Sequence, residues 1–327
     1  MTITGAVKAL AGQEGERREL AEGEARALVA AMLDGGISEL ELGALLALLE
    51  RRRLTPSELL GSATALAQRS FRLRLPGGAA LPVVFASYRG ARTEPNLLPL
   101  LVLVLNRLGV PVLVHGMLDG AGGVAAAYIF RELGIMPCGS LARAQAQLDA
   151  GKPVFVPTAV LAPGLAQLLA LKGRIGLSGF AVALAKVLAP FDGDALHVLA
   201  AEDDGERALL HEFASLKAAR ALLLEATEGE PFANPRRRPR MEYVAAGGSS
   251  VLFDAETAAL RAGAALPGAI DAPSTAAWIR RVLAGELPLP LPLVNQLACC
   301  MFGSGYVDDM NQAKAIVAVE TGSLAAA

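Results

Sequence analysis

Residue types that could bind phosphate gather in one stretch, SYRGARTEPNL (87–97), directly after an apolar run at 81–86. A glycine-containing loop between a strand and a helix commonly binds phosphate, because its backbone N–H groups point at the ligand. This loop also carries arginines, whose planar forks suit phosphate or carboxylate. In the structural alternative, the arginines pair with acidic neighbours such as Glu94. The predicted phosphate-binding residues here are Ser87, Tyr88, Arg89, Gly90, Arg92 and Asn96.

A second basic stretch, NPRRRPR (234–240), packs four arginines into five positions. Its two prolines keep it out of a helix, so the sequence predicts a rigid, exposed loop. Such a run is typical of a surface that binds nucleic acid or another polyanion, and the alternative is a merely solvated loop. The candidate contacts are Arg236, Arg237, Arg238 and Arg240.

The remaining ionisable candidates are scattered. His115, followed by Gly116, ends the apolar run at 110–115, where a histidine is either a hydrogen-bonded core residue or a ligand contact. Glu228 and Glu230 could hold Mg²⁺, but they could equally pair with the arginines of 236–240 or be solvated. The other two histidines and the three cysteines lack the spacing of a metal site, a disulfide or a nucleophile–base pair, and are interpreted as structural.

Charge is segregated along the chain, although the net charge is only −2. Residues 1–50 hold four basic and nine acidic side chains, whereas residues 51–107 hold nine arginines, two glutamates and no lysine. Arginine without lysine favours bidentate contact with phosphate or carboxylate over simple solubility.

Composition limits the class of protein. Hydrophobic residues make up 53% of the chain, which excludes a largely disordered protein. No apolar run is long enough to span a membrane, and the Glu- and Arg-rich residues 13–26 do not resemble a signal peptide. We therefore expect a cytoplasmic protein with no membrane partner.

Periodicity divides the chain into two domains. Amphipathic helices fill residues 1–75, with capping boxes at Ser38–Glu41 and Thr55–Glu58. Apolar strands then alternate with helices, which predicts a central, mostly parallel sheet, but residues 160–190 are helical without a strand signal. The predicted fold is α/β, with a small helical domain (1–75, completed by 160–190) and an α/β domain (76–159 and 191–327).

The order of these elements resembles that of the anthranilate phosphoribosyltransferases, in the glycosyltransferase family 3 fold. The resemblance rests on ARALVAAMLDGGISELELGALLALLERRRLTPSELLGSATAL at the start, on LGVPVLVHG (108–116) and on GRIGLSGFAVALAKVLAPF (173–191). It spans essentially the whole chain and is weakest in the chemical motifs. The family's Asp-Gly-Thr-Gly-Gly phosphate loop becomes Ala86–Ala91, its Lys-His-Gly-Asn becomes 114–117, and Ser178 stands at its anthranilate-contacting arginine.

These departures, together with SYRGARxxPNLxPLL and EGEPxxxPRRRPR, resemble the YbiB-like branch of the fold. That resemblance implies a homodimer that binds DNA or RNA without obvious sequence preference. A helical domain of about 70 residues also has little core of its own, so we expect its helices to form the dimer contact.

The predicted function is therefore a non-catalytic nucleic-acid-binding homodimer that needs no cofactor. The alternative is a glycosyl or phosphoribosyl transferase that acts on a phosphoribosyl donor and an unknown acceptor. Mg²⁺ is expected only under that alternative, because neutralising a departing pyrophosphate usually takes metal and cations.

Overall fold

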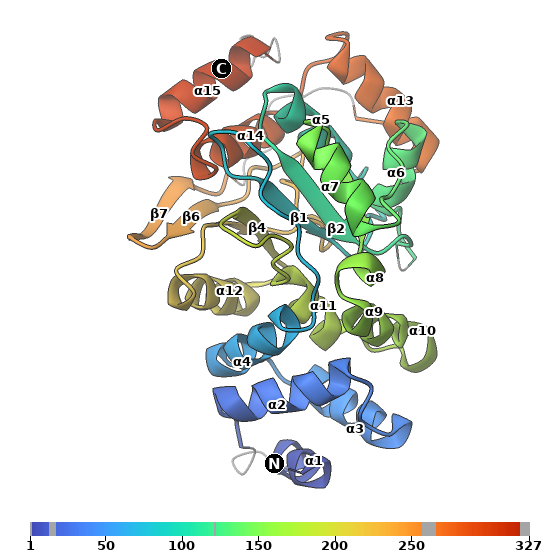
Figure 1. Cartoon of the computed structure of the whole chain (residues 1–327). Helices are drawn as coiled ribbons and strands as arrows, with labels where there is room; N and C mark the ends of the chain where they lie inside the picture. Colours follow the sequence, from blue (N-terminus) through green and yellow to red (C-terminus); the bar gives the residue numbers. More distant parts are fainter. Residues whose placement is uncertain (1, 13–17, 121, 257–265, 321–327) are drawn as a thin grey trace. The chain divides into compact units, whose positions relative to one another are not determined.

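A computed structural model describes residues 2–12, 18–120, 122–256 and 266–320 (Figure 1). The chain divides into two compact units. The first combines residues 1–72 with 158–190, and the second combines residues 73–157 with 191–327. In the described ranges, no helix combines the length and the apolar character that a bilayer crossing requires.

The first unit is helical. A buried apolar stripe on its second helix packs against the fourth, where a Cβ on Gly61 would lie 2.1 Å from the Glu22 carbonyl oxygen. Glycine at this position lets the two backbones cross closely. The helices are α1 (Ile3–Ala11), α2 (Glu22–Leu33), α3 (Glu39–Glu50), α4 (Pro56–Ala67), α8 (Thr158–Leu161), α9 (Pro163–Ala170), α10 (Lys172–Ile175) and α11 (Gly179–Lys186).

The capping box predicted at Thr55–Glu58 begins α4. The Glu58 side chain is 1% exposed and also accepts hydrogen bonds from Arg52 Nη1 at 2.8 Å and from the backbone N–H of Leu20 at 2.8 Å. Burial alone would raise the pKa of Glu58, but these bonds and the one from the Thr55 N–H hold it below its usual value. The Glu58 carboxylate of this capping box therefore also links α4 to Leu20 and Arg52 inside the helical unit.

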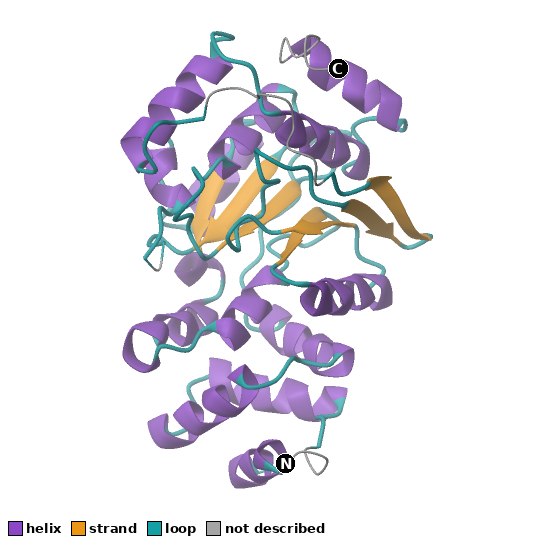
Figure 2. Ribbon diagram, turned by 180° about the vertical axis from the view of Figure 1, so that it is seen from behind, coloured by secondary structure: helices purple, strands orange, loops and turns teal. Residues whose placement is uncertain are grey.

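The second unit is built on one seven-stranded sheet in the order β3-β2-β1-β4-β5-β6-β7. Figure 2 shows its strands in orange with helices packed around them. The first five strands in that order are parallel, and β6 and β7 form an antiparallel hairpin at one edge. The predicted fold class, a helical domain with a mostly parallel α/β domain, is confirmed. The strands are β1 (Val83–Ser87), β2 (Val112–Gly116), β3 (Val154–Pro157), β4 (Leu196–Ala201), β5 (Ala221–Glu225), β6 (Met241–Ala245) and β7 (Gly248–Phe253).

Helices cover the sheet. Alternate side chains of the strands, such as Val83 and Phe85, join one apolar cluster with the helices of one face, and α12 packs on β4 and β5. The helices of this unit are α5 (Leu98–Arg107), α6 (Ala126–Glu132), α7 (Leu141–Asp149), α12 (Asp204–Leu216), α13 (Ala272–Leu283), α14 (Leu291–Gly303) and α15 (Met310–Glu320).

Candidate anion site at the carboxyl edge of the sheet

The candidate site lies where β1, β2 and β5 end. Because these strands are parallel, the loops that follow them meet at one edge of the sheet. Ser87 and Gly116 are register partners at the ends of β1 and β2. A Cβ on Gly90, whose φ is +66°, would lie 2.8 Å from Gly120 Cα and 3.0 Å from the Gly123 carbonyl carbon. The loops after β1 and β2 are therefore packed backbone to backbone.

A carboxylate from the loop after β5 fills the predicted phosphate loop. Glu230 Oε1 accepts hydrogen bonds from the backbone N–H groups of Arg89 at 2.9 Å and Gly90 at 2.8 Å. Its Oε2 accepts from Ser87 Oγ at 2.6 Å and Asn96 Nδ2 at 3.4 Å. Glu230 is completely buried, and its two oxygens accept all four of these hydrogen bonds.

A second carboxylate, two residues earlier, caps the other half of the loop. Glu228 accepts from the backbone N–H groups of Arg92 at 2.6 Å and Thr93 at 3.0 Å, and from the Thr93 hydroxyl at 2.5 Å. The backbone N–H of Glu94 adds a longer bond of 3.4 Å. Burial would raise the pKa of Glu228, but these donors outweigh it and hold that pKa below its usual value.

One tight turn presents both carboxylates. The backbones of Thr227 and Glu230 exchange hydrogen bonds of 3.1 and 2.9 Å. Inside the turn Glu228 has a φ of +53° and Gly229 a φ of +85°. A Cβ on Gly229 would lie 2.3 Å from Arg89 Cγ, so the turn sits directly on the Arg89 side chain.

Arg89 and Arg92, which the sequence predicts to bind phosphate, contact protein groups in the structure. The Arg89 guanidinium is 25% exposed and pairs with Glu202 at 3.0 Å. Arg92 is exposed, and its backbone N–H donates to Glu228. The structural alternative, pairing with an acidic side chain, therefore holds for Arg89, and Glu94 pairs with Arg236, whose Nε lies 2.9 Å from Glu94 Oε1.

Tyr88 and His115 face each other beneath the loop. The Tyr88 hydroxyl lies 2.8 Å from His115 Nδ1, and the rings meet edge to face. Tyr88 is 4% exposed, so its ring offers too little open surface for a base to stack on. Burial, with a smaller contribution from His197, lowers the pKa of His115 to about 3, so this histidine is neutral. Of the two alternatives that the sequence allows for His115, the structure therefore supports the hydrogen-bonded core residue.

The four arginines of 236–240 all have carboxylate partners, and the segment is less exposed than the sequence predicts: Pro239 is buried, and only Arg236 and Arg237 are more than half exposed. Arg236 and Arg237 are 65% and 53% exposed and pair with Glu94 and Glu225. Arg238 is 23% exposed and pairs with Glu256 at 3.3 Å. Arg240 is 42% exposed and pairs with Glu242 at 3.5 Å.

Sequence reasoning did not find the partners that neutralise these cations. The sequence allows Glu228 and Glu230 to pair with the arginines of 236–240, but in the structure their carboxylates bind the loop after β1. The contacting residues that the sequence did not indicate are Thr93, Glu202 and Glu225, whereas Glu94 was expected to pair with an arginine of the loop after β1 and pairs with Arg236. Glu225, the last residue of β5, could have been suspected from its place at the sheet edge; Thr93 and Glu202 carry no signal in the sequence.

The two glutamates do not fit a metal site. A metal ligand needs lone pairs that face an ion, and the oxygens of Glu230 already face N–H and O–H donors. Among the described residues, no cluster of three or more His, Cys, Asp or Glu side chains could hold a metal ion. A Mg²⁺ role for this pair is therefore inconsistent with the geometry.

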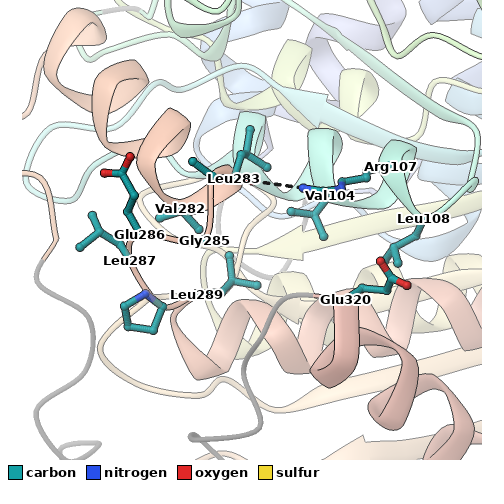
Figure 3. Close-up of a pocket in the computed structure, with 12 residues that line it drawn as sticks. Val104, Arg107, Leu108, Val282, Leu283, Gly285, Glu286, Leu287, Leu289 and Glu320 are labelled. Carbon is teal, nitrogen blue, oxygen red and sulfur yellow. Dashed lines mark hydrogen bonds between the residues drawn. The ribbon is translucent and has the colours of Figure 1, made fainter.

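A separate hollow of about 390 Å³ lies at the other end of α5 (Figure 3). Apolar side chains of α5 and of the segment after α13 line most of it, and Arg107 donates to the Leu283 carbonyl oxygen at 3.1 Å. The charged side chains among its lining residues are Arg107, Glu286 and Glu320. It takes no part in the site built by Glu228 and Glu230.

The Escherichia coli K12 protein YbiB is 37% identical to this chain over 300 residues, covering 91% of this chain and 93% of YbiB. The chain belongs to the YbiB family. Its residues 6–70 match the glycosyl transferase family, helical bundle domain. An anthranilate phosphoribosyltransferase of Synechococcus sp. JA-3-3Ab is 30% identical over 126 residues, 38% of this chain and 36% of the enzyme.

Solved enzymes share the fold of this YbiB-family chain. Anthranilate phosphoribosyltransferase from Thermus thermophilus superposes with a TM-score of 0.76 at 23% identity, covering 97% of this chain and 94% of the enzyme. The Saccharomyces cerevisiae enzyme in complex with PRPP and Mg gives a TM-score of 0.69 at 12% identity, covering 98% and 93%. At these identities the similarity concerns the fold.

Proposed function

We propose that this protein is a non-catalytic, cytoplasmic nucleic-acid-binding homodimer on a phosphoribosyltransferase-like scaffold. The observation that carries the proposal is the occupation of the loop after β1 by Glu228 and Glu230. A phosphoribosyl donor would bring its own phosphates to such a loop, and here the backbone donors already bind protein carboxylates. Under the transferase alternative, the 227–230 turn would have to move away from the loop after β1 before a phosphoribosyl donor could bind there.

The arginines of 236–240 supply the surface for phosphate. Exposed ion pairs contribute only about 0–1 kcal/mol each, so a phosphodiester can replace the carboxylate partner of Arg236 or Arg237 at little cost. The guanidinium fork also matches phosphate geometry. Because Arg236 reaches Glu94, the segment lies beside the exposed Arg92, which extends the proposed basic surface.

The homodimer is proposed through the N-terminal helices. Leu and Ala surround most of α3, yet only Leu45, Leu46 and Leu49 are buried within this chain. Leu40, on the same helix, is 86% exposed. A helix that is apolar on nearly all sides is normally buried, which favours a second copy over it.

The test is binding of fluorescently labelled single- and double-stranded oligonucleotides, measured by anisotropy at two salt concentrations. Each phosphate contact contributes roughly 0.7–0.9 to the slope of log affinity against log salt. We expect the combined Arg236→Ala, Arg237→Ala, Arg238→Ala and Arg240→Ala variant to weaken binding similarly for unrelated sequences and to flatten that slope.

A charge-matched variant controls for net charge. This variant replaces four other exposed, ion-paired arginines by alanine: Arg18, Arg74, Arg174 and Arg281. Its slope of log affinity against log salt should equal that of the wild type. Circular dichroism melts check that both variants fold. The proposal fails if the wild type does not bind at low salt, or if the two variants lose the same slope.

A further inference from the structure

The loop after β1 keeps every donor of an oxyanion site, although its occupant is part of the same chain. The backbone N–H groups of Arg89 and Gly90, with Ser87 Oγ and Asn96 Nδ2, converge on the two oxygens of Glu230. The N–H groups of Arg92 and Thr93 converge on Glu228. Successive N–H groups that point into one concavity bind anions generally, and a side-chain carboxylate is one such anion.

Placing these carboxylates carries a conformational cost. Glu228 adopts a φ of +53°, and Ala218 is the only other non-glycine residue with positive φ in the described ranges. The left-handed region costs an ordinary side chain roughly 1–2 kcal/mol. Glu230 in addition is a fully buried carboxylate, which is stable only when hydrogen bonds replace its water. The strain and the burial are offset by the donors of the loop.

We propose that the 227–230 turn is an intramolecular ligand, and that Glu230 and Glu228 plug two oxyanion subsites that small external anions can occupy when the side chains are removed. The enclosed Glu230 subsite suits a monocarboxylate, because its donors converge on two oxygens of a planar group. The subsite of Glu228 is nearer solvent and suits inorganic phosphate. This inference stands whether or not the protein binds nucleic acid.

Chemical rescue tests the first subsite. Glu230→Ala removes two carbons and the carboxylate oxygens, which is the heavy-atom content of acetate. The variant should melt below the wild type, and acetate should raise its melting temperature in proportion to the logarithm of its concentration, by about 3 °C at tenfold above the dissociation constant. Acetamide, which is neutral, and sodium chloride at equal ionic strength should not.

Matched controls separate a filled subsite from a general salt effect. The wild type and Glu225→Ala should show no such response to acetate, because Glu225 is exposed and pairs with Arg237 away from the loop. The proposal is overturned if acetate stabilises Glu230→Ala no more than these two proteins. In that case the two glutamates stabilise the contact between the turn and the loop after β1 without filling a site for external anions.

The second subsite keeps the proposal testable if Glu230→Ala does not fold. Glu228→Ala leaves the buried carboxylate in place, and inorganic phosphate should raise its melting temperature more than that of the wild type. In two-dimensional NMR spectra, phosphate should shift the amide signals of Arg92 and Thr93 in Glu228→Ala. Equal phosphate responses of variant and wild type, with unshifted amides, would refute this half of the inference.

Discussion

Oε1 of Glu230 lies 2.8 Å from the backbone nitrogen of Gly90, although 140 residues separate the two in sequence. The bond joins the loop after β1 to the loop after β5, across the intervening strand β4. It completes the hydrogen bonding of a loop whose donors would otherwise need water or a ligand. The same contact thus links two loops at the sheet edge and occupies backbone donors that would otherwise face water or a ligand.

Glu230→Gln should destabilise the α/β unit. The amide is isosteric, but its NH₂ group must face N–H or O–H donors, which leaves buried polar groups unpaired at about 1–3 kcal/mol. The control is Glu202→Gln, which loses a partly exposed pair with Arg89 and should cost under about 1 kcal/mol. Urea denaturation measures both, and equal midpoints for the two variants would contradict the buried-anchor role.

Gly90→Ala should be among the most damaging alanine substitutions at the sheet edge. Gly90 has a φ of +66°, and the new Cβ would meet the backbone of Gly120 at 2.8 and 2.9 Å. Backbone cannot move aside as a side chain can, so we expect a loss of at least about 2 kcal/mol. Gly77→Ala, with nothing within 4 Å, should change stability by about 0.5 kcal/mol or less. Thermal melts that rank the two variants in the opposite order would show that the loops repack.

Local signals in the sequence were sufficient for much of the fold. The predicted capping box at Thr55 begins α4, and Ser38 begins α3 as a simple N-cap that accepts from the Glu41 N–H without the reciprocal bond of a box; both depend on residues three apart in the chain. Apolar runs similarly located the parallel strands. The hairpin β6–β7 was not predicted: β7 is mostly exposed, so the sequence GSSVLF lacks the alternation of a half-buried strand.

The candidate site could be predicted only in part. Position at the end of β1 identified the loop, but the carboxylates that contact it come from residues more than 100 positions away. Arg89 meets Glu202, and Gly90 meets Glu230, at separations that no local pattern encodes. The backbone of Glu228, at φ +53°, is likewise a consequence of where its carboxylate must reach.

Acid should destabilise the helical unit through Glu58. Its pKa is lowered from 4.5 in the folded state, so its contribution is fully present above about pH 4.5 and is lost as pH falls through the folded-state value. Glu58→Gln should therefore lower stability at neutral pH and reduce the slope of stability against pH below 4.5. Urea midpoints between pH 3 and 7 measure this. An unchanged slope in the variant would assign the acid sensitivity to other groups.

Anthranilate phosphoribosyltransferase activity should be absent. The donors of the phosphate loop are bound to Glu228 and Glu230, and Ser178 stands where the resembled enzymes carry an arginine for anthranilate. We expect no complementation of a tryptophan auxotroph that lacks the enzyme, with expression confirmed by immunoblot. Steady product formation from anthranilate and phosphoribosyl pyrophosphate by the purified protein would contradict this and favour the transferase alternative.

Leu40→Glu should dissociate the proposed homodimer. Leu40 is 86% exposed on α3, and burying a leucine contributes about 1.5–3 kcal/mol, so a charge there should weaken dimerisation at least about tenfold. The matched control is Leu216→Glu, at the end of α12, where the leucine is 58% exposed in the other unit. Sedimentation at micromolar protein should give a dimer for the wild type and for Leu216→Glu, and a shift toward monomer for Leu40→Glu. A monomeric wild type would refute the dimer, and a dimeric Leu40→Glu variant would place the contact away from Leu40.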